Sequence, residues 1–265
     1  FSPVVRRTER LREMEAMDLS QRCAKIVTAY PPELMRRALA YLYSRETKSS
    51  FQIEHIRVDS SRTEKFIFLL EHARLQDFVT EDSLLAIQNA IVDGRFKADR
   101  YRANQNYVGQ TISPGRERVH YVSPIPADLP GLMSGFMDAH QTMKHGSVAA
   151  VIHAAVISYG FVFLHPFEDG NGRIHRFLIH NILSIRGAVP KGLMFPVSAS
   201  MLKHPDLYDR ALEAFSGPLM QNVDYDLDDL GRMTVRNDTD MLYRYIDMTP
   251  QAEALYDFVW KTVDH

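Results

Sequence analysis

The chain has 265 residues, and its 31 lysines and arginines nearly balance 33 aspartates and glutamates, for a formal net charge of −2. This length is enough for one large domain or two small ones with a real hydrophobic core. With 45% apolar and 24% charged residues, the composition excludes a disordered or fibrous chain. The near-neutral charge balance argues against a dedicated nucleic-acid binder, which usually carries a basic excess.

The single cysteine, Cys23, excludes an intramolecular disulfide framework and a zinc site built from cysteines. From this cysteine usage we expect a cytoplasmic protein. The sequence opens without Met and without an apolar leader, and we interpret it as a fragment of a longer protein. The most apolar run, residues 148–164, is at the short limit for a membrane span and continues into a polar loop, so we predict a buried core helix there.

Apolar residues at helical spacing predict helices over residues 33–46, 66–75 and 83–92. Each of these helices has a start or stop signal in the sequence. The signals are Pro31 and Pro32 before the first helix, a capping box from Ser61 to Glu64 before the second, Thr80 or Asp82 as the cap of the third, and Gly94 at its carboxyl end.

Only one segment has a pattern that predicts strands. Residues 106–112 and 118–122 are β-prone and flank the turn signal Ser113-Pro-Gly115, which predicts a hairpin. Helices are predicted again over residues 131–143, from Ser147 onward, and over residues 171–186 with Gly187 as the stop. The expected fold class is all-α with a small β-hairpin, organised as a helical N-terminal region (1–95), a core domain (96–220) and a helical C-terminal extension (221–265).

The segment 165–176, with the sequence HPFEDGNGRIHR, carries the chemistry. Gly170-Asn171-Gly172 allows the backbone to approach a ligand closely, and the helix that follows adds its positive N-terminal dipole. Arg173 and Arg176 are three residues apart and therefore lie on one face of that helix. This pattern predicts a polyphosphate site, although a helix start with solvated charges would show the same glycines and arginines.

Two further residues favour the phosphate site over the solvated helix start. Asp169 directly precedes the glycines, where a carboxylate can hold Mg²⁺ against phosphate oxygens. His165 enters the same loop from the other side and can act as a general base near neutral pH. The residues alone thus indicate phosphate chemistry with a histidine base.

This segment resembles the signature of the Fic family, H-P-F-x-[D/E]-G-N-G-R-x-x-R, and every specified position matches. The predicted apolar helix before it, the helix after it and the upstream hairpin agree with the family pattern over roughly residues 98–220. The resemblance implies a Fic-type helical core and transfer of AMP from ATP to a protein hydroxyl. A related toxin has Lys at the position of Gly172 and transfers phosphate instead, so the small residue here favours nucleotidyl transfer.

The resemblance also implies a role for each motif residue. Phe167 would anchor the loop to the core. The chemical roles would be general base for His165, Mg²⁺ ligand for Asp169, phosphate cradle for Gly170, Asn171 and Gly172, β-phosphate contact for Arg173 and γ-phosphate contact for Arg176.

Two segments upstream resemble accessory elements of the family. The hairpin resembles the flap that docks the target backbone, with Tyr107, Val108 and Gly109 as docking residues, although an ordinary surface hairpin would show the same pattern. Ser50 and Glu54 resemble the inhibitory motif [S/T]-x-x-x-E-[G/N], in which the Glu pairs with the second arginine, here Arg176. His55 departs from the expected Gly or Asn.

The alternative for this inhibitory segment is a helix start capped by Ser49 or Ser50. Two other patterns are discounted. Acidic residues 224–229 begin like a calcium loop but lack its glycine and final Glu, which favours a solvated turn. Five histidines without a metal-ligand spacing are expected in the core or on the surface: His140, His145, His153, His175 and His180.

The preferred hypothesis is an ATP- and Mg²⁺-dependent protein adenylyltransferase restrained by Glu54. Its partner would be an unidentified protein with a Ser, Thr or Tyr hydroxyl, or the chain itself, with no membrane and no nucleic acid; a homodimer is left open. One alternative is removal of AMP at the same site. The other is a non-catalytic nucleotide sensor or scaffold, against which the intact His165 and Asp169 argue.

Overall fold

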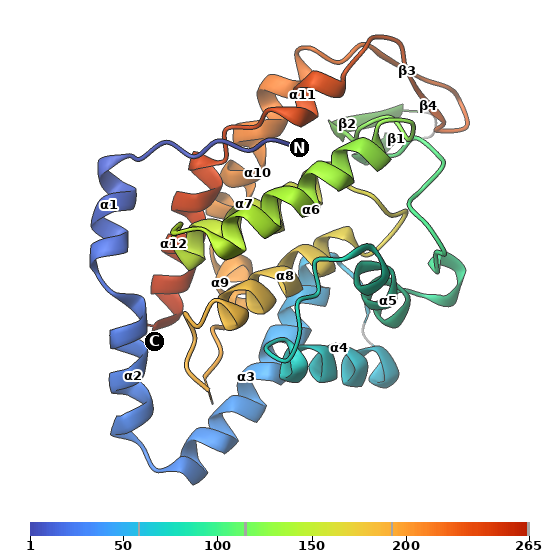
Figure 1. The fold of residues 1–265 in the computed structure, drawn as a ribbon. Helices are drawn as coiled ribbons and strands as arrows, with labels where there is room; N and C mark the ends of the chain where they lie inside the picture. Colours follow the sequence, from blue (N-terminus) through green and yellow to red (C-terminus); the bar gives the residue numbers. More distant parts are fainter. Residues whose placement is uncertain (58, 114–115, 192, 264–265) are drawn as a thin grey trace.

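The computed structural model describes residues 1–57, 59–113, 116–191 and 193–263. The chain is mostly helical with small two-stranded sheets, which confirms the expected fold class (Figure 1). Before the first sheet come α1 (Glu9–Ala16), α2 (Leu19–Ala29), α3 (Pro32–Ile53), α4 (Ser60–His72), α5 (Glu81–Ile91) and the 3₁₀ turn η1 (Gly94–Phe96).

The hairpin is formed by β1 (Tyr107–Ser113) and β2 (Arg116–Val122), close to the predicted strands; the predicted turn at Pro114 and Gly115 lies outside the described residues. The elements after it are α6 (Leu129–His145), α7 (Ala150–Leu164), α8 (Asn171–Ile185), α9 (Val197–Lys203), α10 (Pro205–Met220), β3 (Tyr225–Leu227), β4 (Met233–Val235), α11 (Asp240–Arg244) and α12 (Thr249–Val263).

Helices α7 and α8 form the centre of the molecule and pack along each other (Figure 1). All of α7 except Ala150 and Val162 is buried, as expected for a helix that is apolar on every side. Helices α6 and α12 cover α7, while α3, α4 and α5 contact α8. Among the described helices, none is both long and apolar enough to cross a membrane. The apolar run is therefore the core helix that the sequence predicted.

Several predicted helix boundaries need correction. The cap of α4 is Asp59, whose carboxylate accepts from Arg62 N at 2.8 Å, so the predicted capping box is wrong. Thr80 does cap α5, but Gly94 lies in the 3₁₀ turn and not at the end of this helix. Helix α3 continues to Ile53, because its later residues pack against α8 and α9.

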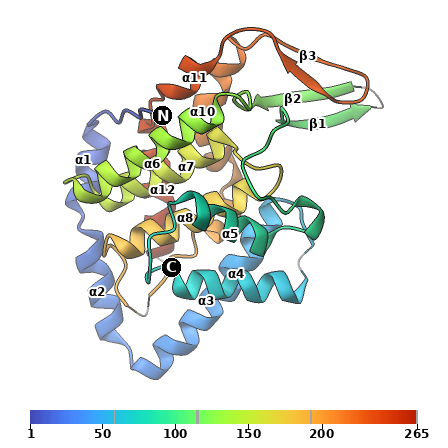
Figure 2. The same ribbon diagram turned by 45° about the vertical axis from the view of Figure 1, so that its right-hand side comes forward.

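A second hairpin, β3–β4, lies in the segment expected to be helical or a solvated acidic turn. Tyr225 and Leu227 pair with Val235 and Met233, and Tyr225, Leu227 and Met233 lie at least partly buried. Asp226 on the outward face is exposed and forms an ion pair with Arg236 at 2.9 Å. The two hairpins lie side by side (Figure 2). A Cβ added at Gly231 would lie 3.6 Å from the Tyr107 hydroxyl.

The first residues of the chain contact its last part. Val4 N donates to Ile246 O at 2.9 Å, and Met248 N donates to Val4 O at 2.8 Å. Helix α1 packs against α12. These contacts join the proposed N-terminal region to the proposed C-terminal extension. They do not test the boundaries at residues 95 and 220, which stay a prediction.

Candidate active site

The loop between α7 and α8 begins with His165, which ends α7 in the left-handed conformation with φ of +49°. Its Nδ1 lies 3.0 Å from Val162 O. Because a carbonyl oxygen can only accept, this contact places the proton on Nδ1 and leaves Nε2 as the acceptor. Burial lowers the pKa of His165 from 6.5 to about 4, so the ring is neutral at physiological pH.

The loop is held by buried polar contacts to its backbone. Asn171 Nδ2 donates to Phe167 O at 2.7 Å, and its Oδ1 accepts from Phe167 N at 3.1 Å. The Phe167 ring is fully buried against Tyr101 and Phe161, as the predicted anchor role requires. The Asn171 side chain, predicted as part of a phosphate cradle, therefore uses both polar atoms to shape the loop.

Arg102 is a further loop residue, and the sequence analysis missed it. It is 5% exposed, and its Nε donates to His165 O at 2.8 Å. Its two terminal nitrogens donate to Asn104 O and Pro124 O. One guanidinium thus ties the loop to both sides of the hairpin. Burial lowers the Arg102 pKa to about 10.

Asp169 and Arg173 form an ion pair at the start of α8. Asp169 Oδ1 accepts from Arg173 NH2 at 2.6 Å and from Gly170 N at 2.7 Å. Arg173 NH1 donates to Ile91 O at 2.7 Å, and its guanidinium lies over the ring of Phe51. Asp169 Oδ2 has no hydrogen-bond partner within the described residues. One carboxylate oxygen is therefore available to a cation.

Gly170 turns the chain into α8 with φ of +94°, a conformation that glycine adopts without strain. A Cβ at Gly170 would lie 2.9 Å from Val92 Cγ1, so the position also has no room for a side chain. The arginines that follow are both buried, Arg173 at 0% and Arg176 at 1% exposed. The alternative of a helix start with solvated charges is therefore wrong.

Arg176 binds the end of α3. Its Nε donates to Ser50 Oγ at 2.9 Å, and its NH2 donates to Ser50 O at 2.8 Å and to Glu54 Oε1 at 2.9 Å. The structure thus brings together the three residues that the inhibitory-motif resemblance connects. Although burial opposes the charge, the Glu54 carboxylate helps to raise the Arg176 pKa above its ordinary value. Arg176 NH1 is buried and forms no hydrogen bond of normal geometry within the described residues, while the nearby Tyr208 hydroxyl also helps to raise the Arg176 pKa.

Gly172 determines how closely Glu54 can approach α8. A Cβ at this position would lie 2.0 Å from Glu54 Oε1 and 3.2 Å from Arg176 NH1. No side chain of any size fits while Glu54 contacts Arg176. The same small residue that the resemblance associates with nucleotidyl transfer is therefore required by the Glu54–Arg176 ion pair.

Glu54 lies at the C-cap of α3, in a Schellman motif. Ile56 N donates to Phe51 O and His55 N donates to Gln52 O. His55 occupies the left-handed position of this motif with φ of +55°. Gly or Asn is usual at that position, which gives a physical reason for the family preference from which His55 departs. The helix-start alternative for Ser49 and Ser50 is wrong, because both lie in the last turns of α3.

A cavity of about 350 Å³ opens beside His165, between β1, β2, the end of α7 and α10. Val108 lines it, whereas Tyr107 and Gly109, the other predicted docking residues, do not. Gly109 lies at a register shift of the hairpin, where a Cβ would be 2.9 Å from Arg118 O. Asp209 and Glu213, one turn apart on α10, line the cavity and form no ion pair within the described residues.

The five discounted histidines lie in the core or on the surface, and four of them make contacts within the fold. His140 Nε2 lies 2.9 Å from Asp77 Oδ2 and its Nδ1 lies 3.0 Å from His153, while His180 bonds Glu46. His175 is buried against Tyr159. His145 is exposed. Within the described part of the chain, no group of three His, Cys, Asp or Glu side chains could hold a metal ion.

Comparison with solved structures identifies the class of fold. A Fic family protein from Desulfovibrio desulfuricans G20 superposes with a TM-score of 0.68 over 100% of this chain and 76% of its own, at 19% identity. A Fic domain containing signalling protein from Bacteroides thetaiotaomicron gives a TM-score of 0.63 over 97% and 94%, at 17% identity. The chain has the fold of Fic proteins.

Sequence comparison places the same domain in a family. Residues 78–183 match the Fic/DOC family model, so this part of the chain is a Fic domain. It is similar to the proteins named "Protein adenylyltransferase Fic" of Drosophila willistoni and Drosophila mojavensis, each 38% identical over 90 residues. These residues are 34% of this chain and 16% of each relative, so the chain spans a small part of the curated relatives it matches.

Proposed function

We propose that this protein transfers AMP from ATP to a Ser, Thr or Tyr hydroxyl of a target protein, with Mg²⁺, and that the Glu54–Arg176 ion pair restrains the reaction. The names of the Drosophila relatives support adenylyl transfer. The observation that carries the proposal is the geometry of His165. Its Nε2 is left as a free acceptor in the wall of a cavity that is large enough for a target side chain.

In the proposed reaction, the target hydroxyl oxygen attacks the α-phosphorus of ATP and its proton moves to His165 Nε2. The bond from the α-phosphorus to the bridging oxygen breaks, and pyrophosphate leaves. The lowered pKa keeps His165 unprotonated and ready to accept this proton. The hydrogen bond from Nδ1 to Val162 O holds the ring in one tautomer and orientation.

The residues at the start of α8 fit a metal-bound triphosphate. Asp169 has one carboxylate oxygen without a partner, and Mg²⁺ is commonly held by one or two carboxylates together with substrate phosphates. Mg²⁺ bound there would neutralise charge on the phosphate oxygens. Within the described residues, Arg176 NH1 is a buried donor without a hydrogen bond of normal geometry, and a phosphate oxygen could satisfy it. The Gly170–Gly172 backbone at the helix N-terminus suits an anion.

Restraint by Glu54 follows from competition for one guanidinium. The Glu54 carboxylate occupies Arg176 NH2, and a phosphate oxygen needs the same donor. A charge-assisted hydrogen bond contributes about 1.5–3 kcal/mol, so its removal should raise adenylyl transfer by roughly 10–100-fold.

The cavity beside His165 suggests what the target segment looks like. Val108 on β1 gives a strand edge along which an extended peptide can lie. Asp209 and Glu213 add two carboxylates without cationic partners among the described residues. A hydroxyl with a Lys or Arg close to it in sequence would complement this charge.

The experiment incubates the Glu54→Gly protein with Mg²⁺ and ATP labelled in the α-phosphate, and follows label on the protein itself and on peptides. Glu54→Gly/His165→Ala is the matched control. We expect label with Glu54→Gly and a loss of about 10²–10⁴-fold in the double variant. The label on wild type should lie well below that on Glu54→Gly.

Each other outcome contradicts a stated part of the proposal. Equal labelling of wild type and Glu54→Gly would show that Glu54 does not restrain the reaction. Label that appears only from γ-labelled ATP would show phosphate transfer instead. Loss of AMP from an adenylylated target, in Mg²⁺ without ATP, would favour the reverse reaction. No transfer by any variant would favour a nucleotide-sensing scaffold.

A further inference from the structure

A second cavity lies far from the phosphate loop and plays no part in the proposed reaction. It has a volume of about 510 Å³, which is in the range of small-molecule sites. It lies between α2, α3, the segment before α9, α9 and the end of α12. We call it the apolar cavity, because Ile26, Leu34, Met35, Leu39, Met194 and Phe195 form much of its wall.

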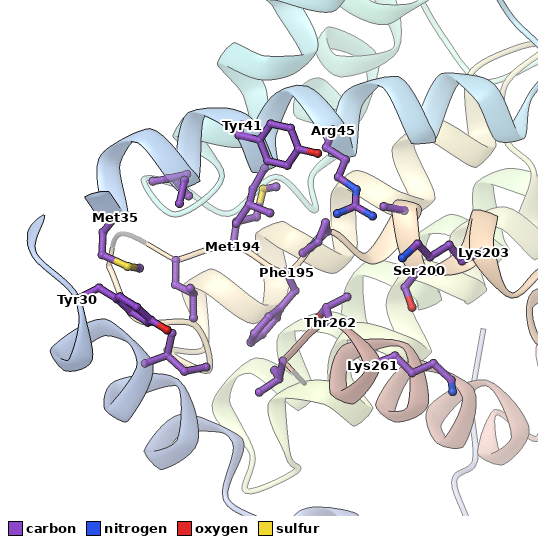
Figure 3. A pocket seen from close by; sticks show the side chains of 18 of the residues that line it. Tyr30, Met35, Tyr41, Arg45, Met194, Phe195, Ser200, Lys203, Lys261 and Thr262 are labelled. Atoms are coloured by element: carbon purple, nitrogen blue, oxygen red, sulfur yellow. The ribbon is translucent and has the colours of Figure 1, made fainter. Parts of the chain in front are cut away.

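The lysine and arginine side chains of the apolar cavity lie at one end. Figure 3 shows Arg45, Lys203 and Lys261 together on one side, while Tyr30 and Met35 lie at the opposite side. The three cationic side chains come from α3, α9 and α12, elements that are distant in sequence. The cavity thus has an apolar end and a positively charged end.

The described residues supply no negative charge to the three cations. None of Arg45, Lys203 and Lys261 forms an ion pair or a side-chain hydrogen bond within the described residues. Glu46, the acidic neighbour of Arg45, is buried and already bonds His180 and Ser198. A ligand that brings its own negative charge would complement these side chains.

Ser200 gives an independent sign of a missing polar partner. It lines the cavity near the cationic end, is 6% exposed, and its Oγ has no hydrogen-bond partner within the described residues. Figure 3 places it next to Lys203. A buried hydroxyl without a partner costs free energy, and rotation of the Ser200 side chain toward the cavity would let a polar headgroup at this end satisfy it.

We infer that the apolar cavity binds a long-chain fatty acid, with its carboxylate among Arg45, Ser200 and Lys203 and its hydrocarbon chain along the apolar wall. The charge favours a fatty acid over a neutral lipid.

The test titrates octanoate, decanoate and laurate, each below its micelle concentration, into the 265-residue protein by calorimetry. Burial of each methylene should tighten Kd about fourfold, so each step of two methylenes along this series should tighten it by roughly 15-fold. Decanol, which has the chain without the charge, should bind at least tenfold more weakly than decanoate. Affinity that does not change with chain length, or equal binding of decanol, would overturn the inference.

Two variants locate the binding site. Lys203→Glu/Lys261→Glu reverses the charge at exposed positions and should weaken decanoate binding at least tenfold; Lys48→Glu, exposed on α3 and outside the cavity, is the control and should change nothing. Ala38→Trp fills the cavity from its exposed rim and should also abolish binding. Binding that survives both cavity variants would place the ligand elsewhere and sink the proposal.

Ser200→Ala separates the ligand from a purely structural role. The variant should stabilise the empty protein slightly, because an unpartnered hydroxyl is removed, yet weaken decanoate binding severalfold. Sedimentation of wild type and Ala38→Trp tests the other occupant. A wild-type dimer that dissociates in Ala38→Trp would show that a second copy covers the cavity, and the fatty-acid site would be wrong.

Discussion

The two ends of helix α3 depart from the usual rule of burial in opposite directions. Its last turns bury polar and charged side chains, among them Glu46, Thr47 and Ser50. Its first turns expose large apolar side chains, with Leu34 at 51% and Tyr41 at 64% exposed. A buried polar group needs a hydrogen-bond partner within the fold. An exposed apolar surface beside a cavity can instead bind a ligand.

The difference shows which part of this helix is bonded within the fold and which part can bind a ligand. At the α8 end, Ser50 and Glu54 complete hydrogen bonds to a buried guanidinium, so a change there disturbs the folded chain and the phosphate site together. On the side of α3 that faces the apolar cavity, Arg45 has no partner within the described residues, so a change there should affect ligand binding alone. Variants at the two ends should therefore separate stability from binding.

Arg176→Ala should have the largest effect on stability. It removes a side chain that is 1% exposed and leaves Ser50 and Glu54 without their donor. We expect the free energy of unfolding to fall by about 2–4 kcal/mol. Arg45→Ala, on the side of α3 that faces the apolar cavity, should stay within about 0.5 kcal/mol of wild type. Urea unfolding measures the free energy of unfolding of both variants. Equal decreases would contradict the proposed difference between the two parts of α3.

Gly172→Ala should change activity through Glu54. The new Cβ would lie 2.0 Å from Glu54 Oε1, so the carboxylate must leave Arg176. We expect adenylyl transfer to rise by roughly tenfold in the wild-type background. Gly217→Ala, where the added Cβ meets open space, is the control.

The same substitution in the Glu54→Gly background separates two roles of Gly172. Without the carboxylate there is nothing to displace, so no rise is expected. A fall in that background would measure how closely the nucleotide approaches Gly172. An identical effect in both backgrounds would show that Gly172 does not act through Glu54.

The pH profile of Glu54→Gly tests His165. A base must be unprotonated, and burial lowers this pKa from 6.5 to about 4. We expect kcat/KM to stay level from pH 7 to pH 5, where a base with the ordinary pKa would lose roughly 30-fold. Because the unfolded chain keeps the ordinary pKa, the same shift costs folding stability as pH falls from 6.5 toward 4. A profile that falls near pH 6.5 would show that the pKa of the His165 base is not lowered.

Ser50→Ala should have a smaller effect than Arg176→Ala, because it removes one acceptor and keeps the guanidinium. Arg176 Nε would lose its 2.9 Å partner in a buried site, at a cost of about 1–3 kcal/mol. Ser44→Ala, on the same helix and without a hydrogen bond among the described residues, is the control. Thermal unfolding of both variants measures the difference.

Local sequence patterns predicted the residues of the site better than the residues that hold the loop in place. The histidine, the glycines and the arginines of residues 165–176 are contiguous, so one loop and one helix start determine their placement. Arg102 could not be found in this way. Its three bonds reach backbone carbonyls of residues that come together only in the folded chain, and no side-chain pattern marks them.

The missed second hairpin shows a different limit. Tyr225 and Leu227 alternate with Asp224, Asp226 and Asp228, which is the period-two pattern of a strand. The density of aspartates favoured a solvated turn instead. The structure places Asp226 outward against Arg236, which is ten residues further along the chain. Pairing across the hairpin therefore stabilises a strand that its own composition disfavours.

His55→Gly should have the smallest effect and the most specific one. His55 closes the Schellman motif beside Glu54 with φ of +55°, whereas α8 ends in the same motif with Gly187 at φ of +69°. Removing the Cβ should stabilise the fold by about 0.5–1 kcal/mol and lower basal adenylyl transfer, because the cap that positions Glu54 becomes less strained.

The mirror-image control is Gly187→Ala, which should destabilise by about 1 kcal/mol and leave the phosphate site unchanged. If His55→Gly instead destabilises the chain, the imidazole makes a contribution that outweighs the strain of the left-handed backbone. His55, in place of the Gly or Asn of the inhibitory motif, would then stabilise the fold. Restraint by Glu54 would not depend on backbone strain at the cap.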